Sequence, residues 1–184
     1  MACLCVFAGA ASGDTKDFTQ KAYDLAGALS AAGHSFIYGG GQTGLMGAFA
    51  NGVIAKGGHI EGVIPEFLSD REVAHEGVAK MTVTQTMHER KMLMYKPADG
   101  FLILPGGLGT LDETMEVLTW RQLGRLSGPV FTFSPDGFWQ PMKDLIDHIE
   151  AKGFAHSKGL GQIYWHEDIT ALSDACNAHF ASSK

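Results

Sequence analysis

The stretch FLILPGGLGTLDETMEVLTW, residues 101–120, contains the features that decide the fold. A short apolar run has the composition of a buried strand, a glycine-rich turn follows it, and a helical pattern begins directly after the turn. Short apolar runs and helical patterns alternate along the rest of the chain as well. This alternation predicts an α/β, Rossmann-like fold, in which a parallel sheet carries helices on both faces.

The hydrophobic periodicity sets the expected elements. Six strands are expected, at Cys3–Ala8, Ser35–Tyr38, His59–Ile64, Met81–Thr84, Phe101–Leu104 and Val130–Phe133. The apolar positions of residues 18–29 fall on one face of a first helix, which Gly33 ends. Further helices are expected at Leu45–Lys56, Met87–Lys96, Leu111–Leu123, Phe138–Lys152 and Ile169–Ala181. No repeat or linker interrupts the pattern, so residues 1–184 are expected to form a single domain.

Composition excludes several classes of function. Fourteen Lys and Arg against twenty Asp and Glu give a net charge of −6, which opposes general binding of nucleic acid. No segment approaches the roughly 18 consecutive apolar residues of a membrane helix, so we expect no membrane partner. The N-terminal MACLCVFAG lacks the basic start of a signal peptide and is interpreted as a buried strand. The expected compartment is the cytoplasm.

The cysteines and histidines predict no metal site. Cys3 and Cys5 share one face of the first strand, either as small core residues, the interpretation we favour, or as a reactive or metal-binding pair. No Cys/His cluster has the spacing of a zinc site, and no His-Glu pair extends to HExxH. No lysine lies in an arrangement that suggests a pyridoxal phosphate site, and we expect no cofactor.

Three glycine-rich turns are expected at the carboxyl ends of strands, where open parallel sheets bind their ligands. They are AGAASG at 8–13, YGGGQTGLMG at 38–47 and PGGLGT at 105–110. Each leads toward a helix N-terminus, whose unpaired N–H groups and dipole favour an anion, and glycine lets the backbone approach a phosphate closely. Neither the dinucleotide fingerprint nor a Walker lysine is present, so a mononucleotide is the expected ligand.

Two T-x-x-E segments fit the helix-starting capping box, Thr86/Glu89 and Thr110/Glu113. For Glu89 this structural interpretation is preferred. For Glu113 a catalytic role is an equal alternative, because it lies in the first turn of the helix expected to hold the phosphate. Glu116 follows three residues later on the same face, which would separate the pKa values of the two carboxyl groups.

Arg90 and Lys91 near the start of the preceding helix oppose its dipole, which is reasonable if an anion binds there. The alternative for Arg90 is a salt bridge to Glu113 or Glu116. Leu45, Met46 and Met87 form either an adaptable apolar slot for a base or ordinary core.

PGGLGTLDE and MHERK, together with YGGGQTGLMG and EVAHEGV at 72–78, resemble the signatures of the LONELY GUY family over about residues 5–153. Members of that family are cytokinin riboside 5′-monophosphate phosphoribohydrolases, long mislabelled as lysine decarboxylases. The resemblance implies a Rossmann-like homodimer that hydrolyses the N-glycosidic bond of a nucleoside 5′-monophosphate with an adenine-type base, N6-prenylated in the cytokinin nucleotides. The products are the free base and ribose 5-phosphate. An interface could use Trp120, Arg121 and Leu123.

The resemblance also implies site residues. The catalytic pair of the family falls on Arg90 and Glu113. Phosphate and substrate contacts fall on Gly106, Gly107, Gly109, Thr110, Lys91, Glu72 and Thr119, with Ser12, Gly41, Met46 and Met87 as further candidates. Glu113 would stabilise oxocarbenium character on the ribose and orient or deprotonate the attacking water, while Arg90 would position the nucleotide.

The chain departs from the family pattern at Ala10 and Ala11, where serines are usual, at Phe18, where a tyrosine is common, and at Pro97, which is expected to end a helix. Two other functions stay open. One is hydrolysis of ordinary purine monophosphates such as AMP. The other is non-catalytic binding, as in molybdenum cofactor carriers of the same fold.

Overall fold

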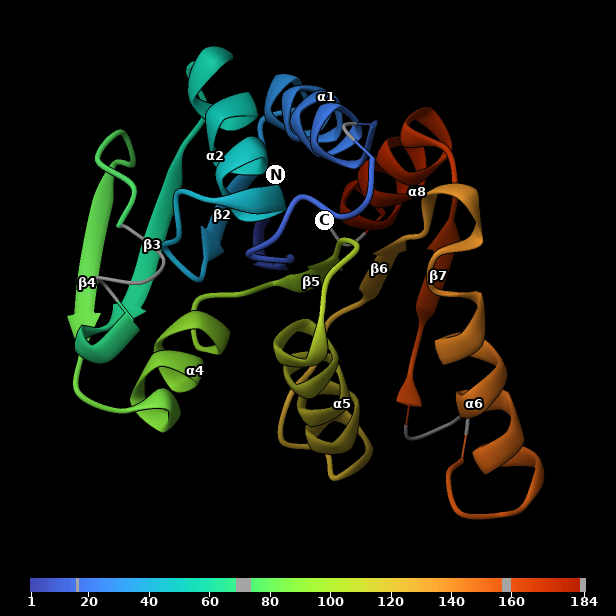
Figure 1. Cartoon of the computed structure of the whole chain (residues 1–184). Helices are drawn as coiled ribbons and strands as arrows, with labels where there is room; N and C mark the ends of the chain where they lie inside the picture. The colour runs from blue at the N-terminus through green and yellow to red at the C-terminus, as the bar shows by residue number, and fades with distance from the viewer. Residues whose placement is uncertain (16, 69–73, 157–159, 183–184) are drawn as a thin grey trace.

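The computed structural model describes residues 1–15, 17–68, 74–156 and 160–182 and contains a seven-stranded parallel sheet of order β4-β3-β2-β1-β5-β6-β7 (Figure 1). The strands are β1 (Cys3–Phe7), β2 (Ser35–Tyr38), β3 (Ile60–Pro65), β4 (Lys80–Thr84), β5 (Gly100–Ile103), β6 (Val130–Phe133) and β7 (Ile163–His166). After β4 the chain returns to the middle of the sheet and places β5 beside β1. The order therefore reverses between β1 and β5, the point where open α/β sheets bind ligands.

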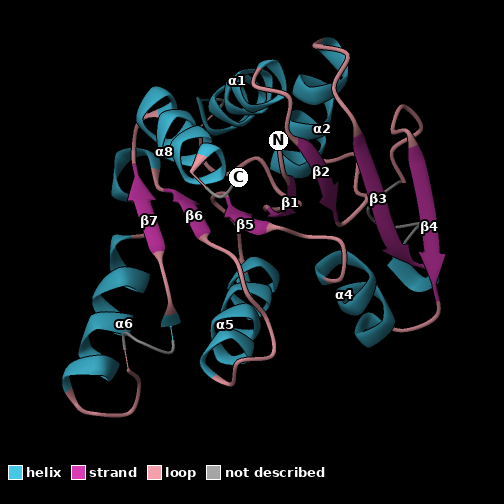
Figure 2. Ribbon diagram, turned by 180° about the vertical axis from the view of Figure 1, so that it is seen from behind, coloured by secondary structure: helices cyan, strands magenta, loops and turns pink. Residues whose placement is uncertain are grey.

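Helices cover both faces of the sheet, as Figures 1 and 2 show from opposite sides. They are α1 (Asp17–Ala31), α2 (Gly44–Ala55), α4 (Met87–Tyr95), α5 (Leu108–Gln122), α6 (Gln140–Ala151) and α8 (Ile169–Ala181), with a 3-10 turn η1 (Pro135–Gly137) before α6. One core joins the sheet to α1, α2 and α8, and a second joins it to α4, α5 and α6. The expected Rossmann-like α/β fold is confirmed.

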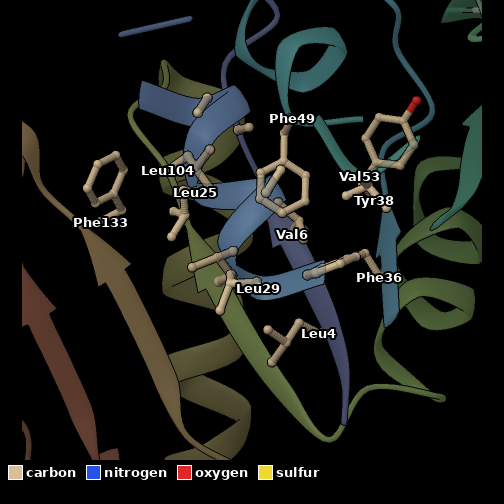
Figure 3. Close-up of a cluster of buried hydrophobic side chains, with 14 of the residues drawn as sticks. Leu4, Val6, Leu25, Leu29, Phe36, Tyr38, Phe49, Val53, Leu104 and Phe133 are labelled. Carbon is tan, nitrogen blue, oxygen red and sulfur yellow. The ribbon is translucent and has the colours of Figure 1, made fainter. Parts of the chain in front are cut away.

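Strand β1 shows how the sequence pattern builds both cores. Leu4 and Val6 lie in the first core with Leu25 and Phe49 (Figure 3), whereas Cys5 contributes to the second. Successive side chains of a strand point to opposite faces, so a continuous apolar run is what a strand covered on both sides requires. Cys3 packs against the same core as Cys5, as expected for small core residues.

Several element ends follow from local chemistry. Gly33, at φ +84°, donates its N–H to Ser30 O at 2.9 Å and closes α1. Helix α4 ends at Tyr95, before Pro97. Two expectations were incomplete: β7 was not predicted, and α5 begins at Leu108 rather than Leu111 because Gly107 is its N-cap.

Within the described part of the chain, no helix combines the length and apolar character needed to cross a membrane.

Candidate active site

A cavity of about 560 Å³ lies where β1, β2, β5 and β6 end. Its walls come from the loops after these strands and from α1, α2, α4 and α5. The lining residues are Val6, Ala8, Gly9, Ala10, Ala11, Gly13, Phe18, Gly39, Leu45, Met46, Met87, Arg90, Pro105, Gly106, Gly107, Gly109, Thr110, Asp112, Glu113 and Phe138. The cavity therefore occupies the edge at which the strand order reverses.

The first two glycine turns bind each other rather than leaving helix ends open. Gly9 O accepts the N–H groups of Leu45 at 2.9 Å and Met46 at 3.2 Å, the second and third residues of α2. Gly44, at φ +59°, packs directly against the backbone of Ala10. The first turn is also separated from α1, which begins only at Asp17. The expectation that each turn presents free helix N–H groups to an anion is therefore wrong for these two turns.

The third turn keeps its helix end open. Gly107 is the N-cap of α5, and no side chain caps the N–H groups of the first turn. A Cβ added at Gly106 would lie 2.7 Å from Thr110 Cβ and 2.9 Å from Gly9 N, so packing requires glycine there. A Cβ at Gly107 or Gly109 would meet no protein atom within 4 Å. The open space above these two glycines is where a ligand can approach the N-terminus of α5.

The two T-x-x-E segments differ in the structure. Thr86 caps α4, because its Oγ1 accepts the N–H of Glu89 at 3.1 Å, and Glu89 Oε2 accepts the N–H of Gln85 at 3.0 Å. Thr110 caps nothing, since it lies inside α5. Both Thr110 and Glu113 are buried and line the cavity. The capping interpretation of Glu113 is therefore wrong.

Arg90 reaches the cavity from α4 with 6% of its surface exposed. Its Nε donates to Val63 O at 3.1 Å and its Nη2 donates to Gly39 O at 3.0 Å. Two backbone carbonyls, one within β3 and one just after β2, thus fix the plane of the guanidinium. A rigid planar donor at a cavity wall suits recognition of ribose hydroxyls or phosphate oxygens.

The buried thiol beneath the site does not provide a nucleophile. Full burial, with the negative charge of Glu113 as a second cause, raises the pKa of Cys5 well above its ordinary value. A thiol must lose its proton to attack, so Cys5 is an inert core residue. Within the described residues, no three His, Cys, Asp or Glu side chains are grouped closely enough to hold a metal ion.

Other residues expected at the site lie elsewhere. Lys91 is absent from the cavity lining and forms ion pairs with Asp112, which does line the cavity, and with Glu116. Thr119 is exposed, and its hydroxyl donates to Met115 O at 2.7 Å. Ser12 is exposed between two lining residues, and Gly41 pairs with Ala74 in an isolated bridge. Glu72 lies outside the described residues.

Met46 and Met87 do line the cavity, and the structure adds residues that sequence reasoning did not assign to the site. Phe138 follows η1 and packs edge-to-face on Phe18, with ring centroids 5.7 Å apart and an interplanar angle of 76°. Its position in the loop after β6 was the available signal, because such loops meet at the ligand edge.

The chain matches the family model described as "Possible lysine decarboxylase" over residues 46–176. It is 40% identical over 154 residues to the Arabidopsis thaliana protein named cytokinin riboside 5′-monophosphate phosphoribohydrolase LOG2, covering 84% of this chain and 72% of that protein. It is 42% identical over 151 residues to the Oryza sativa subsp. japonica protein named cytokinin riboside 5′-monophosphate phosphoribohydrolase LOG. That match covers 82% of this chain and 62% of the rice protein.

Among solved structures, the molybdenum cofactor carrier protein from Chlamydomonas reinhardtii superposes with a TM-score of 0.76 over 98% of both chains. DNA processing protein A from Helicobacter pylori superposes with a TM-score of 0.57, covering 97% of this chain and 81% of that one. These two are only 17% and 13% identical and show a shared fold alone. The family model and the plant relatives go further, and the chain belongs to the LONELY GUY (LOG) family.

Proposed function

We propose that the protein hydrolyses the N-glycosidic bond of N6-prenylated adenosine 5′-monophosphate, releasing the free base and ribose 5-phosphate. One observation carries the proposal: Arg90 and Glu113 line the same cavity as the open N-terminus of α5. A phosphate site beside a buried carboxylate is the arrangement that cleavage of a nucleotide requires. The names of the plant relatives support the same reaction.

The turn of residues 105–110 anchors the 5′-phosphate. The N–H groups at the start of α5 and the positive end of its dipole face the anion, and Gly107 and Gly109 leave room for its oxygens. Binding energy from this non-reacting group aligns the ribose for attack, so the phosphate contributes to rate as well as to affinity.

Glu113 acts on the ribose. It lies three residues after Thr110 and thus on the same side of α5, which places its carboxylate beside the anchored nucleotide. As the bond to the base breaks, its electron pair leaves with the base and positive charge develops on the sugar. Glu113 stabilises that charge and takes a proton from the water that attacks the sugar carbon, while the departing base takes up one proton, so that water is added across the broken bond. Arg90, held by Gly39 O and Val63 O, holds the sugar or the phosphate in position for the reaction.

An apolar part of the cavity accommodates the base. Leu45 and Met46 from α2 and Met87 from α4 contribute aliphatic and thioether groups to the wall. Met87 Sδ lies 3.9 Å from Arg90 Nη1, so this wall adjoins the guanidinium. Flexible methionines adapt to bases with and without an N6 substituent.

The alternative of a cofactor carrier is not favoured. The carrier proteins share the fold at 17% identity, whereas relatives named as hydrolases share about 40%.

The test of the proposed function is a parallel hydrolysis assay in which AMP and isopentenyladenosine 5′-monophosphate are supplied separately and the released base is separated by chromatography. Faster cleavage of the prenylated substrate supports the proposal. Faster cleavage of AMP makes the protein a general purine nucleotide hydrolase, and release from neither refutes the hydrolase.

We further propose that the protein is a homodimer, joined through α4 and α5. A groove of about 390 Å³ beside these helices is lined largely by Met92, Leu93, Tyr95, Trp120 and Leu126. Met92 and Leu93 are each 39% exposed, an apolar surface that a second copy would cover. Of the expected interface residues, Arg121 is buried and donates to Gln162 O at 3.2 Å, so it serves the chain's own fold. The cytoplasmic compartment stays a prediction.

A further inference from the structure

Lys91 joins the two helices that carry the proposed catalytic pair. It follows Arg90 on α4, and its side chain is only 13% exposed. Its Nζ lies 2.7 Å from Asp112 Oδ2 and 3.1 Å from Glu116 Oε2, both on α5. Asp112 and Glu116 are four residues apart, so they lie on one face of α5 and bind the same ammonium.

These contacts direct Lys91 toward α5. Burial alone would lower the pKa of Lys91, but the hydrogen bonds to Asp112 and Glu116 raise it above the ordinary value. The side chain is therefore a firmly held cation, and it is absent from the lining of the cavity. The family resemblance assigns Lys91 to ligand contact, whereas the structure shows it bound to two carboxylates.

The two carboxylates differ in their interaction partners other than Lys91. Glu116 Oε2 also accepts the Tyr95 hydroxyl at 2.7 Å. Asp112 has Lys91 as its ion-pair partner within the described residues. Asp112 also lines the cavity, two residues after Thr110, where a phosphate dianion is proposed to bind. The Asp112 side chain is 64% exposed, so without Lys91 only solvent would screen its negative charge at the wall of the anion site.

We infer that Lys91 is a positioning residue that neutralises Asp112 at the phosphate site and ties the helix of Arg90 to the helix of Glu113. This inference rests on the proposed function, because it assumes a ligand with a 5′-phosphate. It predicts that Lys91 acts on the nucleotide through Asp112 and not by direct contact. Removal of the charges of both Lys91 and Asp112 should then restore the affinity for the nucleotide that removal of the lysine alone weakens.

The test compares K91M, the double variants K91M/D112N and K91M/E116Q, and K143M. Lys143 pairs with exposed Asp147 on α6, so K143M makes the same charge change away from the cavity. We expect K91M to raise the KM for the monophosphate by roughly 5–10-fold through repulsion of the phosphate, with a smaller change in kcat. K91M/D112N should return KM to within about threefold of the wild type, while K91M/E116Q should not, because Asp112 stays unpaired. K143M should match the wild type.

Two outcomes overturn the inference. Wild-type KM in K91M would show that neutralisation is unnecessary, and a K91M/D112N variant as impaired as K91M would indicate direct contact of Lys91 with the ligand. Melting temperatures without ligand identify any variant that is impaired because it is unfolded. If the wild type cleaves no monophosphate, the proposed reaction fails separately. The same rescue is then measured through the affinity of AMP, from its effect on melting temperature.

Discussion

At the scale of single residues, the glycines of one turn serve two different purposes. Gly106 packs against Thr110 and Gly9, whereas Gly109 faces open space. We expect Gly106→Ala to lower the free energy of unfolding by about 1–3 kcal/mol, the cost of overpacking. Gly109→Ala should keep or slightly raise stability, because alanine favours a helix, yet raise the KM for a monophosphate by at least about tenfold. Urea unfolding and steady-state kinetics on both variants measure this contrast. Unchanged KM in Gly109→Ala would contradict the phosphate site.

Glu113 is the residue on which the proposed chemistry depends. Glu113→Gln retains the shape and most hydrogen-bonding capacity of the side chain but cannot accept the proton of the attacking water. We expect hydrolysis to fall by about 100-fold or more, the usual effect of losing an acid–base group. The shift in melting temperature caused by AMP should persist, since the phosphate turn is intact. Chromatographic assay of the released base measures the loss, and hydrolysis at the wild-type rate would refute the role of Glu113.

At the scale of elements, His75 holds residues 74–79, which lead into β4, against α2 and the turn after β2. Its backbone N–H donates to Gly40 O at 3.0 Å. Its ring Nδ1 accepts the backbone N–H of Gly77 at 3.1 Å, and its ring Nε2 lies 3.2 Å from Asn51 Oδ1. Acceptance at Nδ1 requires the neutral ring with its proton on Nε2. Burial lowers the pKa of His75 below its ordinary value of 6.5, because the imidazolium loses hydration.

This lowered pKa makes a prediction about stability. Well above pH 6.5 the ring is neutral in both states, so its contribution to stability is complete. As the pH falls from there toward the folded-state pKa, the unfolded chain takes up a proton and the folded protein does not, and stability is lost. We expect His75→Gln to be less stable than the wild type at neutral pH, by about 1–2 kcal/mol. The difference should shrink below the ordinary pKa of histidine.

Urea unfolding of the wild type and His75→Gln at neutral and mildly acidic pH measures the change. His148→Gln, on the exposed surface of α6, is the matched control and should follow the wild type at every pH. A stability difference between the wild type and His75→Gln that stays constant with pH would show that the ring does not titrate in this way.

At the scale of the whole molecule, hydrophobic periodicity predicted the layers because each buried strand and each one-sided helix has its own sequence signature. Strand β7 was missed because Ile163–His166 is short and half-buried at the edge of the sheet, which leaves a weak pattern. The cavity was harder to predict. The bond from Gly9 O to the start of α2 and the pairing of Phe18 with Phe138 join segments far apart in sequence. Such contacts depend on how loops meet at the sheet edge, and a local sequence motif does not predict them.

The proposed dimer is the prediction that concerns the molecule as a whole. Stable dimers bury roughly 800 Å² per partner around an apolar centre, and the groove between α4 and α5 provides such a centre. We expect light scattering after gel filtration to give twice the chain mass of 19.7 kDa. Leu93→Asp should give the monomer mass, because a buried unpaired charge at the interface is costly. Leu145→Asp, a change of the same kind at a half-exposed position on α6, should remain dimeric. A dimer in the Leu93→Asp variant would place the interface on another face of the protein. A monomeric wild type would refute the proposed dimer, and the cavity would then function within one chain.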